Sequence, residues 1–138
     1  MKGSPSGFRL FDASFIRFLI VGVANTMTGL LVIYAAKWFF GANDVLANVI
    51  GYGLGLIQSF ILNSTWTFKH RGKVLPALAK FLLTFLCAYA LNLATVMAAI
   101  HLFSVNSYVA QAMGILPYTL FFYLASRYFV FMPDKGAA

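Results

Sequence analysis

The chain has 138 residues and a formal net charge of +7, but only 9% of its residues are charged and 62% are hydrophobic. A soluble domain devotes about 25% of its residues to charge, because its surface must face water. Most of this surface must therefore face lipid, which excludes a soluble enzyme and a disordered chain and argues against nucleic acid as a partner. Cys87 is the single cysteine, so neither an intrachain disulfide nor a multi-thiolate metal site is possible.

Charge-free runs predict four membrane-spanning helices. The uncharged stretches 18–36, 45–68 and 81–126 contain 19, 24 and 46 residues, and a helix needs about 20 residues to cross a bilayer. The last stretch is long enough for two spans, and the polar segment 101–107 divides it, with Ser104, Asn106 and Ser107 as turn formers. We therefore predict an all-α membrane protein with spans near 17–39, 45–65, 78–102 and 107–127.

The basic residues are distributed unequally between the two ends of these spans. Nine of the ten fall on one side, and Lys37 alone falls on the other. Because positive residues favour the cytoplasmic side, both termini are predicted to be cytoplasmic. The first apolar segment is too long for a signal peptide and is expected to be a retained span. Residues 1–14 would form a cytoplasmic or interfacial leader, and residues 132–138 a cytoplasmic tail. Phe8, Phe11 and Phe15 fall near one helical face and suggest a short interfacial helix over residues 8–17.

The chain matches itself without gaps at an offset of 63 residues. Arg17-Phe18-Leu19 falls on Lys80-Phe81-Leu82, Gly51 falls on Gly114, and the segment 60–68 falls on 123–131. Each unit holds two spans, an even number, so both units must insert the same way round. The fold is thus predicted to consist of two parallel two-helix repeats, an arrangement that recurs in transporters with sites at the repeat interface.

The same segments carry a resemblance to a known family over residues 15–131. The segment Arg17-Phe-Leu-Ile-Val-Gly-Val-Ala-Asn-Thr26 resembles the opening of the GtrA-like family. Further similar elements are Leu46-Ala-Asn48, Leu62-Asn63, Trp66-Thr-Phe68, Lys80-Phe81, Ala110-Gln111, Ser126-Arg127 and Val130-Phe131. Members often carry an arginine directly after the asparagine that ends the second span. This chain has Ser64 there, and its repeat mate is Arg127.

The resemblance implies a four-span protein of the bacterial inner membrane that works in the synthesis of cell-surface polysaccharide. It further implies that the chain flips a polyprenyl-phosphate-linked sugar from the cytoplasmic to the periplasmic leaflet. No enzymatic activity and no cofactor are expected. The expected partners are that sugar lipid, membrane lipids and other copies of the chain in a dimer or larger homo-oligomer, because four short helices leave little room to enclose a sugar headgroup.

Polar side chains within the spans are the candidate site residues, because burying them in a bilayer is costly. At 1.5 Å per residue, Asn25 lies about 12 Å above Arg17, and Gln58 lies at a similar depth on the second span. Asn92 falls near the middle of the third span. The cytoplasmic ends carry Asn63 and three cations that could meet a phosphate. The candidate substrate-binding residues are thus Arg17, Asn25, Gln58, Asn63, Lys80, Asn92 and Arg127.

Each of these residues also has a purely structural interpretation. Intramembrane amides, including Asn48 and Gln111, often bond only to neighbouring helices, at about 0.6 kcal/mol each. Arg17, Lys80 and Arg127 sit where any cation would reach anionic lipid headgroups. The sequence leaves both interpretations open.

A second class of function is a non-transporting accessory or binding subunit of a membrane glycosyltransferase. Polar residues distributed through the depth of the spans favour a pathway over a scaffold. A small multidrug exporter would fit the size, but proton-coupled export of cations needs an intramembrane carboxylate. The chain has no glutamate, and Asp12, Asp44 and Asp134 lie outside the predicted spans.

Overall fold

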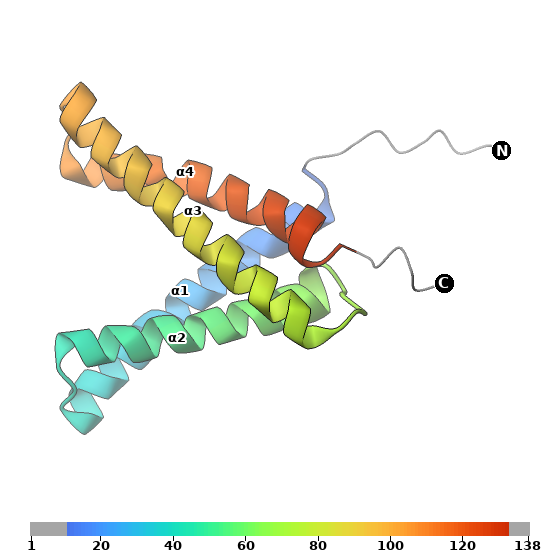
Figure 1. Cartoon of the computed structure of the whole chain (residues 1–138). Coiled ribbons are helices and arrows are strands. Elements are labelled where there is room, and N and C mark those ends of the chain that lie inside the picture. The colour runs from blue at the N-terminus through green and yellow to red at the C-terminus, as the bar shows by residue number, and fades with distance from the viewer. Residues whose placement is uncertain (1–10, 133–138) are drawn as a thin grey trace. The chain divides into compact units, whose positions relative to one another are not determined.

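Four long helices follow one another along the chain; the first pairs with the second and the third with the fourth, so that each pair forms a hairpin (Figure 1). The computed structural model describes residues 11–132, which divide into two units at Lys69. The first unit contains α1 (Ala13–Phe40), α2 (Asp44–Leu62) and the π-helical turn η1 (Asn63–Thr67); the second contains α3 (Val74–Phe103), α4 (Ser107–Ala125) and the π-helical turn η2 (Ser126–Val130).

The described residues confirm the four predicted helices. All four are long and apolar enough to cross a membrane when each π-helical turn is counted with the helix before it. Large apolar side chains such as Leu31 and Leu116 remain about 70% exposed (68% and 73%), as expected for surfaces that face lipid. Cys87 is exposed on α3. The chain is therefore a multi-pass membrane protein.

The first helix begins earlier than the charge pattern predicts. Asp12 is extended and caps α1, accepting hydrogen bonds from the backbone amides of Ser14 at 3.0 Å and Phe15 at 3.4 Å. The prediction of a separate interfacial helix through residues 8–17 is therefore wrong, because the extended Asp12 interrupts it. Phe8 itself lies outside the described residues. Phe11 packs edge-on against Phe15, with their ring centroids 4.9 Å apart.

The third helix also begins before its predicted start, at Val74 rather than near residue 78. The charge-free run indicates only the part of the helix that can lie in lipid, whereas the helix itself can continue beyond the bilayer. Pro76 is compatible with this early start because the first backbone N–H groups of a helix have no partner within it.

The two hairpins turn in the same way at equivalent positions. Gly41 and Ser104 both adopt left-handed backbone angles, with φ of 60° and 53°, and end α1 and α3. Asn43 and Asn106 then cap α2 and α4, their side chains accepting from the backbone amides of Leu46 and Tyr108, each at 2.8 Å. The break predicted within the polar segment 101–107 is thus confirmed, at residues 104–106.

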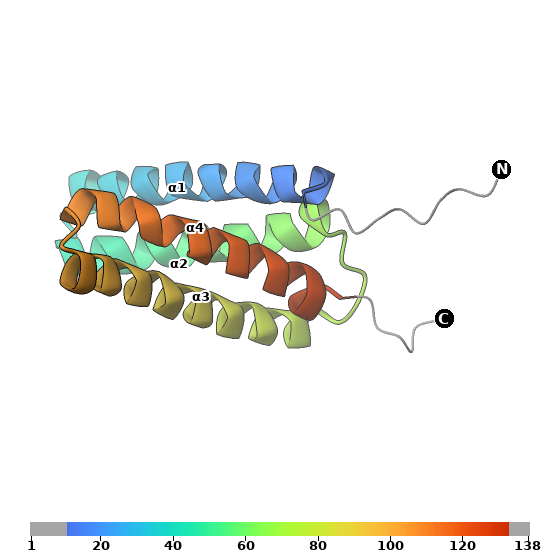
Figure 2. The same cartoon turned by 90° about the horizontal axis from the view of Figure 1, so that it is seen from above.

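Glycine allows α1 and α2 to lie in close contact, side by side in both views (Figures 1 and 2). A Cβ atom on Gly51 would stand 2.5 Å from Cγ1 of Ile33 and 3.0 Å from the backbone oxygen of Gly29. Four residues on, Gly55 is also buried and approaches the backbone oxygen of Asn25. Gly51 and Gly55, four residues apart, therefore form a close helix-packing face on α2.

We expect Gly51→Ala to destabilise the protein by about 1–3 kcal/mol, because the added methyl overpacks this contact. Gly53→Ala is the matched control: it lies one half-turn away on the same helix, where a Cβ would meet nothing within 4 Å. Thermal unfolding in detergent should show a lower Tm for Gly51→Ala and an unchanged or slightly higher Tm for Gly53→Ala. Equal Tm values for the two variants would contradict this account of the contact.

The second hairpin repeats the first. Gly114, the mate of Gly51, lies against Val96 and Asn92, which are the mates of Ile33 and Gly29. Ala47 and Ala110 are both fully buried, and their backbone amides both donate to the N-cap oxygen four residues earlier at 2.9 Å. The sequence repeat at offset 63 is therefore a repeat of local structure.

The orientation of the chain in the membrane stays a prediction that labelling can test. In a Cys87→Ala background, a cysteine at Ala42, in the turn between α1 and α2, should react with an impermeant thiol reagent added to sealed cells. A cysteine at Gly72, before α3, should not react, because the basic bias places that loop in the cytoplasm. Permeabilised cells provide the control in which both sites react. Labelling of Gly72→Cys in sealed cells would contradict the predicted orientation of the chain in the membrane.

Candidate functional site

The predicted cytoplasmic end of the first unit is built around the wide turn η1. The amide of Phe68 donates to the oxygen of Asn63 at 2.9 Å, five residues back, which opens the helix into a π turn. Such turns often occur at functional sites. Asn63 and Thr67, at the two ends of η1, are only 1% and 4% exposed. The Nδ2 group of Asn63 donates to the Ser59 hydroxyl at 3.2 Å.

Two buried polar atoms of this turn have no hydrogen-bond partner among the described residues. They are the Oδ1 atom of Asn63 and the Oγ1 atom of Thr67. A buried polar group without a partner costs about 1–3 kcal/mol, so a native structure usually provides one, whether from protein, water or ligand. The turn therefore contains one amide oxygen and one hydroxyl whose hydrogen-bond partners are not among the described residues.

Arg17 joins the beginning of α1 to this turn. Its guanidinium lies over Trp66, with Cζ 5.6 Å from the ring centroid, and Nη1 is 3.5 Å from the Trp66 carbonyl oxygen. The next residue, Phe18, packs on Phe68 with centroids 6.4 Å apart. Arg17, one of the predicted substrate-binding residues, is thus held beside η1, which begins at Asn63.

The second unit reproduces this arrangement with different side chains. Lys80 lies over Phe129 at 5.3 Å, and Phe81 packs on Phe131 at 6.2 Å. The amide of Phe131 donates to the oxygen of Ser126 at 2.9 Å, which closes η2 as Phe68 closes η1. Ser126 is fully buried, and its hydroxyl oxygen has no partner among the described residues.

Arg127 is the cation by which the second unit differs from the first. Its Nη1 group donates to the Tyr123 hydroxyl at 2.8 Å, and its Cζ atom lies 5.4 Å from the centre of the Tyr128 ring. Tyr123 is fully buried, so it supplies a fixed support for the guanidinium. The equivalent Ser64 uses its hydroxyl to bond the Ile61 carbonyl of its own helix at 3.1 Å.

Deeper along the first unit, the predicted residues Asn25 and Gln58 are both half-buried. The Oδ1 atom of Asn25 is buried and has no partner among the described residues. The backbone oxygen of Asn25 faces Gly55 across the α1–α2 contact, 3.6 Å from where a Cβ would stand. Gln58 is three residues from Gly55, so the two amides lie within about one helical turn of each other in depth.

Asn92 has a different setting in the second unit. A Cβ on Gly114 would stand 2.6 Å from the Asn92 amide nitrogen. The side chain therefore fills the contact between α3 and α4, and this explains why glycine occupies position 114. A role for Asn92 in binding stays a prediction.

The structure thus brings the predicted residues together only within each unit. Arg17 lies beside the turn that contains Asn63, and Lys80 lies beside the turn that contains Arg127. A single cluster of all four at one membrane face remains a prediction. Thr67 and Ser126 are not among the substrate-binding residues predicted from the sequence. Their signal was available, because Ser126 is the repeat mate of Asn63 and Thr67 lies one turn beyond Asn63.

At the opposite ends of the helices of the first unit, polar side chains bond to nearby residues of the same unit. Lys37, the exception to the basic bias, forms an ion pair with Asp44, so this turn adds little net charge. Asn48 donates to the Asp44 carbonyl oxygen at 2.7 Å. Within residues 11–132, no three His, Cys, Asp or Glu side chains are grouped so that they could hold a metal ion.

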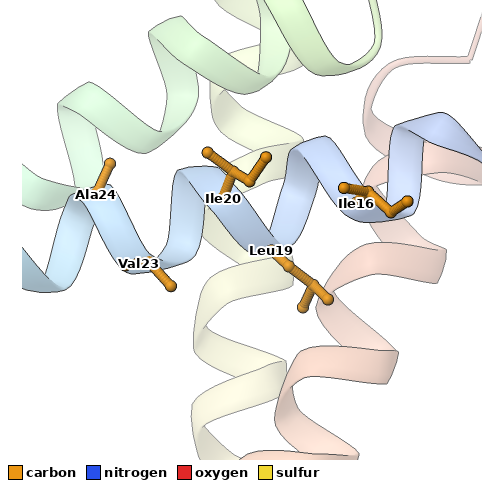
Figure 3. A pocket seen from close by; sticks show the side chains of 5 residues that line it. All are labelled: Ile16, Leu19, Ile20, Val23 and Ala24. Atoms are coloured by element: carbon orange, nitrogen blue, oxygen red, sulfur yellow. The ribbon is translucent and has the colours of Figure 1, made fainter.

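Two surface depressions of the described residues are open and mostly apolar. One lies on α1 and is lined by Ile16, Leu19, Ile20, Val23 and Ala24, as Figure 3 shows. A second is formed by α3 and α4 around Ala98 and Met113. Neither presents a charged group to a phosphate, so the candidate polar site is the set of buried groups described above.

Comparison with known proteins assigns the chain to a family. A family model described as "GtrA/DPMS, transmembrane domain" matches residues 17–131, which include all four spans and both π-helical turns. The search of curated proteins gives no match. The family match begins at Arg17 and ends at Phe131, and it confirms the resemblance found in the sequence. The chain belongs to the GtrA/DPMS transmembrane-domain family.

Proposed function

We propose that this protein moves a polyprenyl-phosphate-linked sugar from the cytoplasmic to the periplasmic leaflet of a bacterial inner membrane, for cell-surface polysaccharide or glycan modification. Family membership supports a membrane protein of this type. The observation that carries the proposal is the set of buried polar atoms without partners, at Asn25, Asn63, Thr67 and Ser126. Most side chains of these helices are apolar, so a polar headgroup passing along them is the simplest partner for such atoms.

The proposed pathway begins at the cations and continues through neutral groups. Arg17, Lys80 and Arg127 would receive the phosphate at the cytoplasmic face, where charge is well solvated. Asn63, Gln58, Asn25 and Asn92 would exchange hydrogen bonds with the headgroup at greater depth. Amides suit this task because a buried Lys or Arg costs about 2.5–3.5 kcal/mol at the centre of a span.

The proposal includes a homodimer or larger homo-oligomer. The depressions on the described residues are shallow, and enclosing a sugar away from lipid requires more surrounding surface than they provide. Crosslinking in native membranes at low protein density should capture dimers or larger species. Exclusively monomeric protein with full transport activity would contradict the proposed homo-oligomer.

The test is reconstitution in liposomes. Polyprenyl-phosphate hexoses are placed in one leaflet, and movement is followed by the loss of access of an impermeant oxidant to the sugar. We expect movement with wild-type protein above that of protein-free liposomes and of liposomes that hold equal amounts of folded Arg127→Ala protein. No movement of any tested sugar lipid by folded protein would contradict transport and favour the accessory subunit of a membrane glycosyltransferase.

A further inference from the structure

In the second unit, a cluster of aromatic rings lies between the two helices. Phe122 on α4 lies 5.2 Å from Phe81 and 6.4 Å from Phe85 on α3, measured between ring centroids. Tyr118, about one turn before Phe122, lies 5.8 Å from it. The two units match at an offset of 63 residues in their caps, turns and glycine contacts, so the first unit shows what an equivalent pair of helices carries at the same places.

The first unit has much smaller side chains at three of these four places. The matched pairs, second unit before first, are Phe85 and Gly22, Tyr118 and Gly55, and Phe122 and Ser59. Close helix packing explains Gly55, because a Cβ there would stand 3.6 Å from the backbone oxygen of Asn25. At Gly22, a Cβ would meet nothing within 4 Å among the described residues. Glycine destabilises the interior of a helix relative to alanine, so packing within the first unit gives no reason for Gly22.

The buried residues that continue from Ser59 towards the predicted cytoplasmic end are polar. Ser59, Asn63 and Thr67 follow one another at intervals of four residues and are 8%, 1% and 4% exposed. The matched residues of the second unit are Phe122, Ser126 and Val130. The second unit therefore demonstrates that apolar side chains satisfy the fold at two of these three places. In the first unit, Oδ1 of Asn63 and Oγ1 of Thr67 are buried without a hydrogen-bond partner among the described residues.

Gly22 lies beside this polar row, within the same hairpin. The backbone oxygen of Asn25 faces Gly55, and α1 and α2 run in opposite directions. Gly22 precedes Asn25 by three residues, so it lies level with Ser59, which follows Gly55 by four. Asn63 is one further turn away, about 6 Å along the helix. The side-chain volume that is unfilled at Gly22 is therefore about one helical turn from Asn63.

The unpaired atoms restrict the chemical group that can meet them. Oδ1 of Asn63 only accepts hydrogen bonds, and a phosphodiester has no hydrogen to donate to it. A sugar hydroxyl both donates and accepts, so it suits this oxygen and also the hydroxyl of Thr67. The two groups are about 6 Å apart along the chain axis, a distance that one sugar ring with its hydroxyls spans. Arg17, held over Trp66 in the same turn, is the cation that a phosphate linked to such a sugar would meet.

We propose that this part of the first hairpin recognises the sugar of the lipid headgroup: Asn63 and Thr67 hydrogen-bond its hydroxyls, and the small residues Gly22 and Ser59 leave room for its ring. The inference rests on the proposed handling of a sugar-phosphate lipid. It goes further in placing the discrimination between a sugar-bearing lipid and bare polyprenyl phosphate within one hairpin, at the turn η1.

The test copies two residues of the second unit into the first. Thr67→Val removes one hydroxyl and introduces the residue found at position 130, and Gly22→Phe fills the space with the residue found at position 85. The control for the first change is Thr95→Val, at an exposed hydroxyl that bonds the Leu91 carbonyl of its own helix at 2.9 Å. The control for the second is Gly53→Phe, at another glycine whose Cβ would meet nothing within 4 Å among the described residues.

Binding of detergent-solubilised protein is measured for polyprenyl phosphate and for its glucose, galactose, mannose and N-acetylglucosamine derivatives. Wild-type and both control proteins should bind at least one sugar-bearing lipid about tenfold more tightly than polyprenyl phosphate, the effect of two hydrogen bonds of ordinary strength. Thr67→Val should reduce this preference to about threefold, because one of the two bonds is lost. Gly22→Phe should abolish the preference, because the ring occupies the place of the sugar. Both variants should keep the wild-type affinity for polyprenyl phosphate and a Tm no lower than that of the wild type.

Four results would overturn the assignment of the sugar to this turn. They are the absence of any sugar preference in the wild type, a full preference in both Thr67→Val and Gly22→Phe, an equal loss in the controls, and a clear loss of Tm in both variants, which would assign the residues to packing.

The proposed function fails in a different way. Normal sugar preference together with no movement of any lipid across liposomes would overturn transport and leave the sugar site standing. Movement of sugar lipids by a wild-type protein that binds them no better than polyprenyl phosphate would support transport and overturn the sugar site.

Discussion

Replacing Arg127 by lysine should reduce transport of a polyprenyl-phosphate-linked sugar about tenfold, the effect of losing about 1.4 kcal/mol from charge-assisted hydrogen bonding. Arginine presents a rigid planar set of donors, whereas lysine is a flexible point charge. Here the guanidinium is also oriented by the Tyr123 hydroxyl and the Tyr128 ring. Transport is measured in liposomes at equal amounts of folded protein.

The matched control is Arg71→Lys, the same change at an exposed residue in the loop before α3, and it should leave transport unchanged. Tyr123→Phe removes only the supporting hydroxyl and should give a smaller loss, about threefold. If Arg127 serves only to anchor the helix in anionic lipid, lysine will serve equally well. Equal transport by wild type and Arg127→Lys would therefore overturn the assignment of this residue to the phosphate.

The largest expected effect on stability is that of Phe81→Ala. Phe81 is fully buried, with ring centroids 5.2 Å from Phe122 and 6.2 Å from Phe131. Lipid tails are as apolar as a side chain, so the loss arises from packing and from the cavity rather than from transfer to water. We expect a loss of about 3 kcal/mol in the free energy of unfolding, seen as a lower Tm in detergent.

Leu83→Ala provides the control on the same helix, because this leucine is 55% exposed and its truncation leaves no cavity. Its Tm should stay close to that of the wild type. The repeat mate Phe18→Ala should fall between the two, since Phe18 is 8% exposed and packs on Phe68 at the longer distance of 6.4 Å. A Tm for Phe81→Ala equal to that of Leu83→Ala would contradict the central role of this aromatic group.

The amino-acid sequence alone determined the class of protein, the four helices and the repeat. Charge is so costly in a bilayer that its absence marks each span, and no knowledge of neighbouring helices is needed. The turn at Ser104 and Asn106 could also be predicted from the sequence, because a residue with left-handed backbone angles and an N-cap residue each have local chemical preferences. The offset of 63 residues, read from matched motifs, predicted two equivalent two-helix units, whereas the matching caps and cation–aromatic pairs came from the structure.

Only the tertiary structure decided which polar side chains have hydrogen-bond partners within the protein. Asn48 and Asn25 look alike in the sequence, yet the amide of Asn48 bonds its own helix, whereas Oδ1 of Asn25 is buried without a partner among the described residues. The roles of Asn92 against Gly114 and of Tyr123 beneath Arg127 were likewise hidden. These helices are apolar on all sides, so hydrophobic periodicity cannot indicate which face of a span meets its neighbour. That choice depends on helix packing, and packing sets which atoms are buried, paired or available to a ligand.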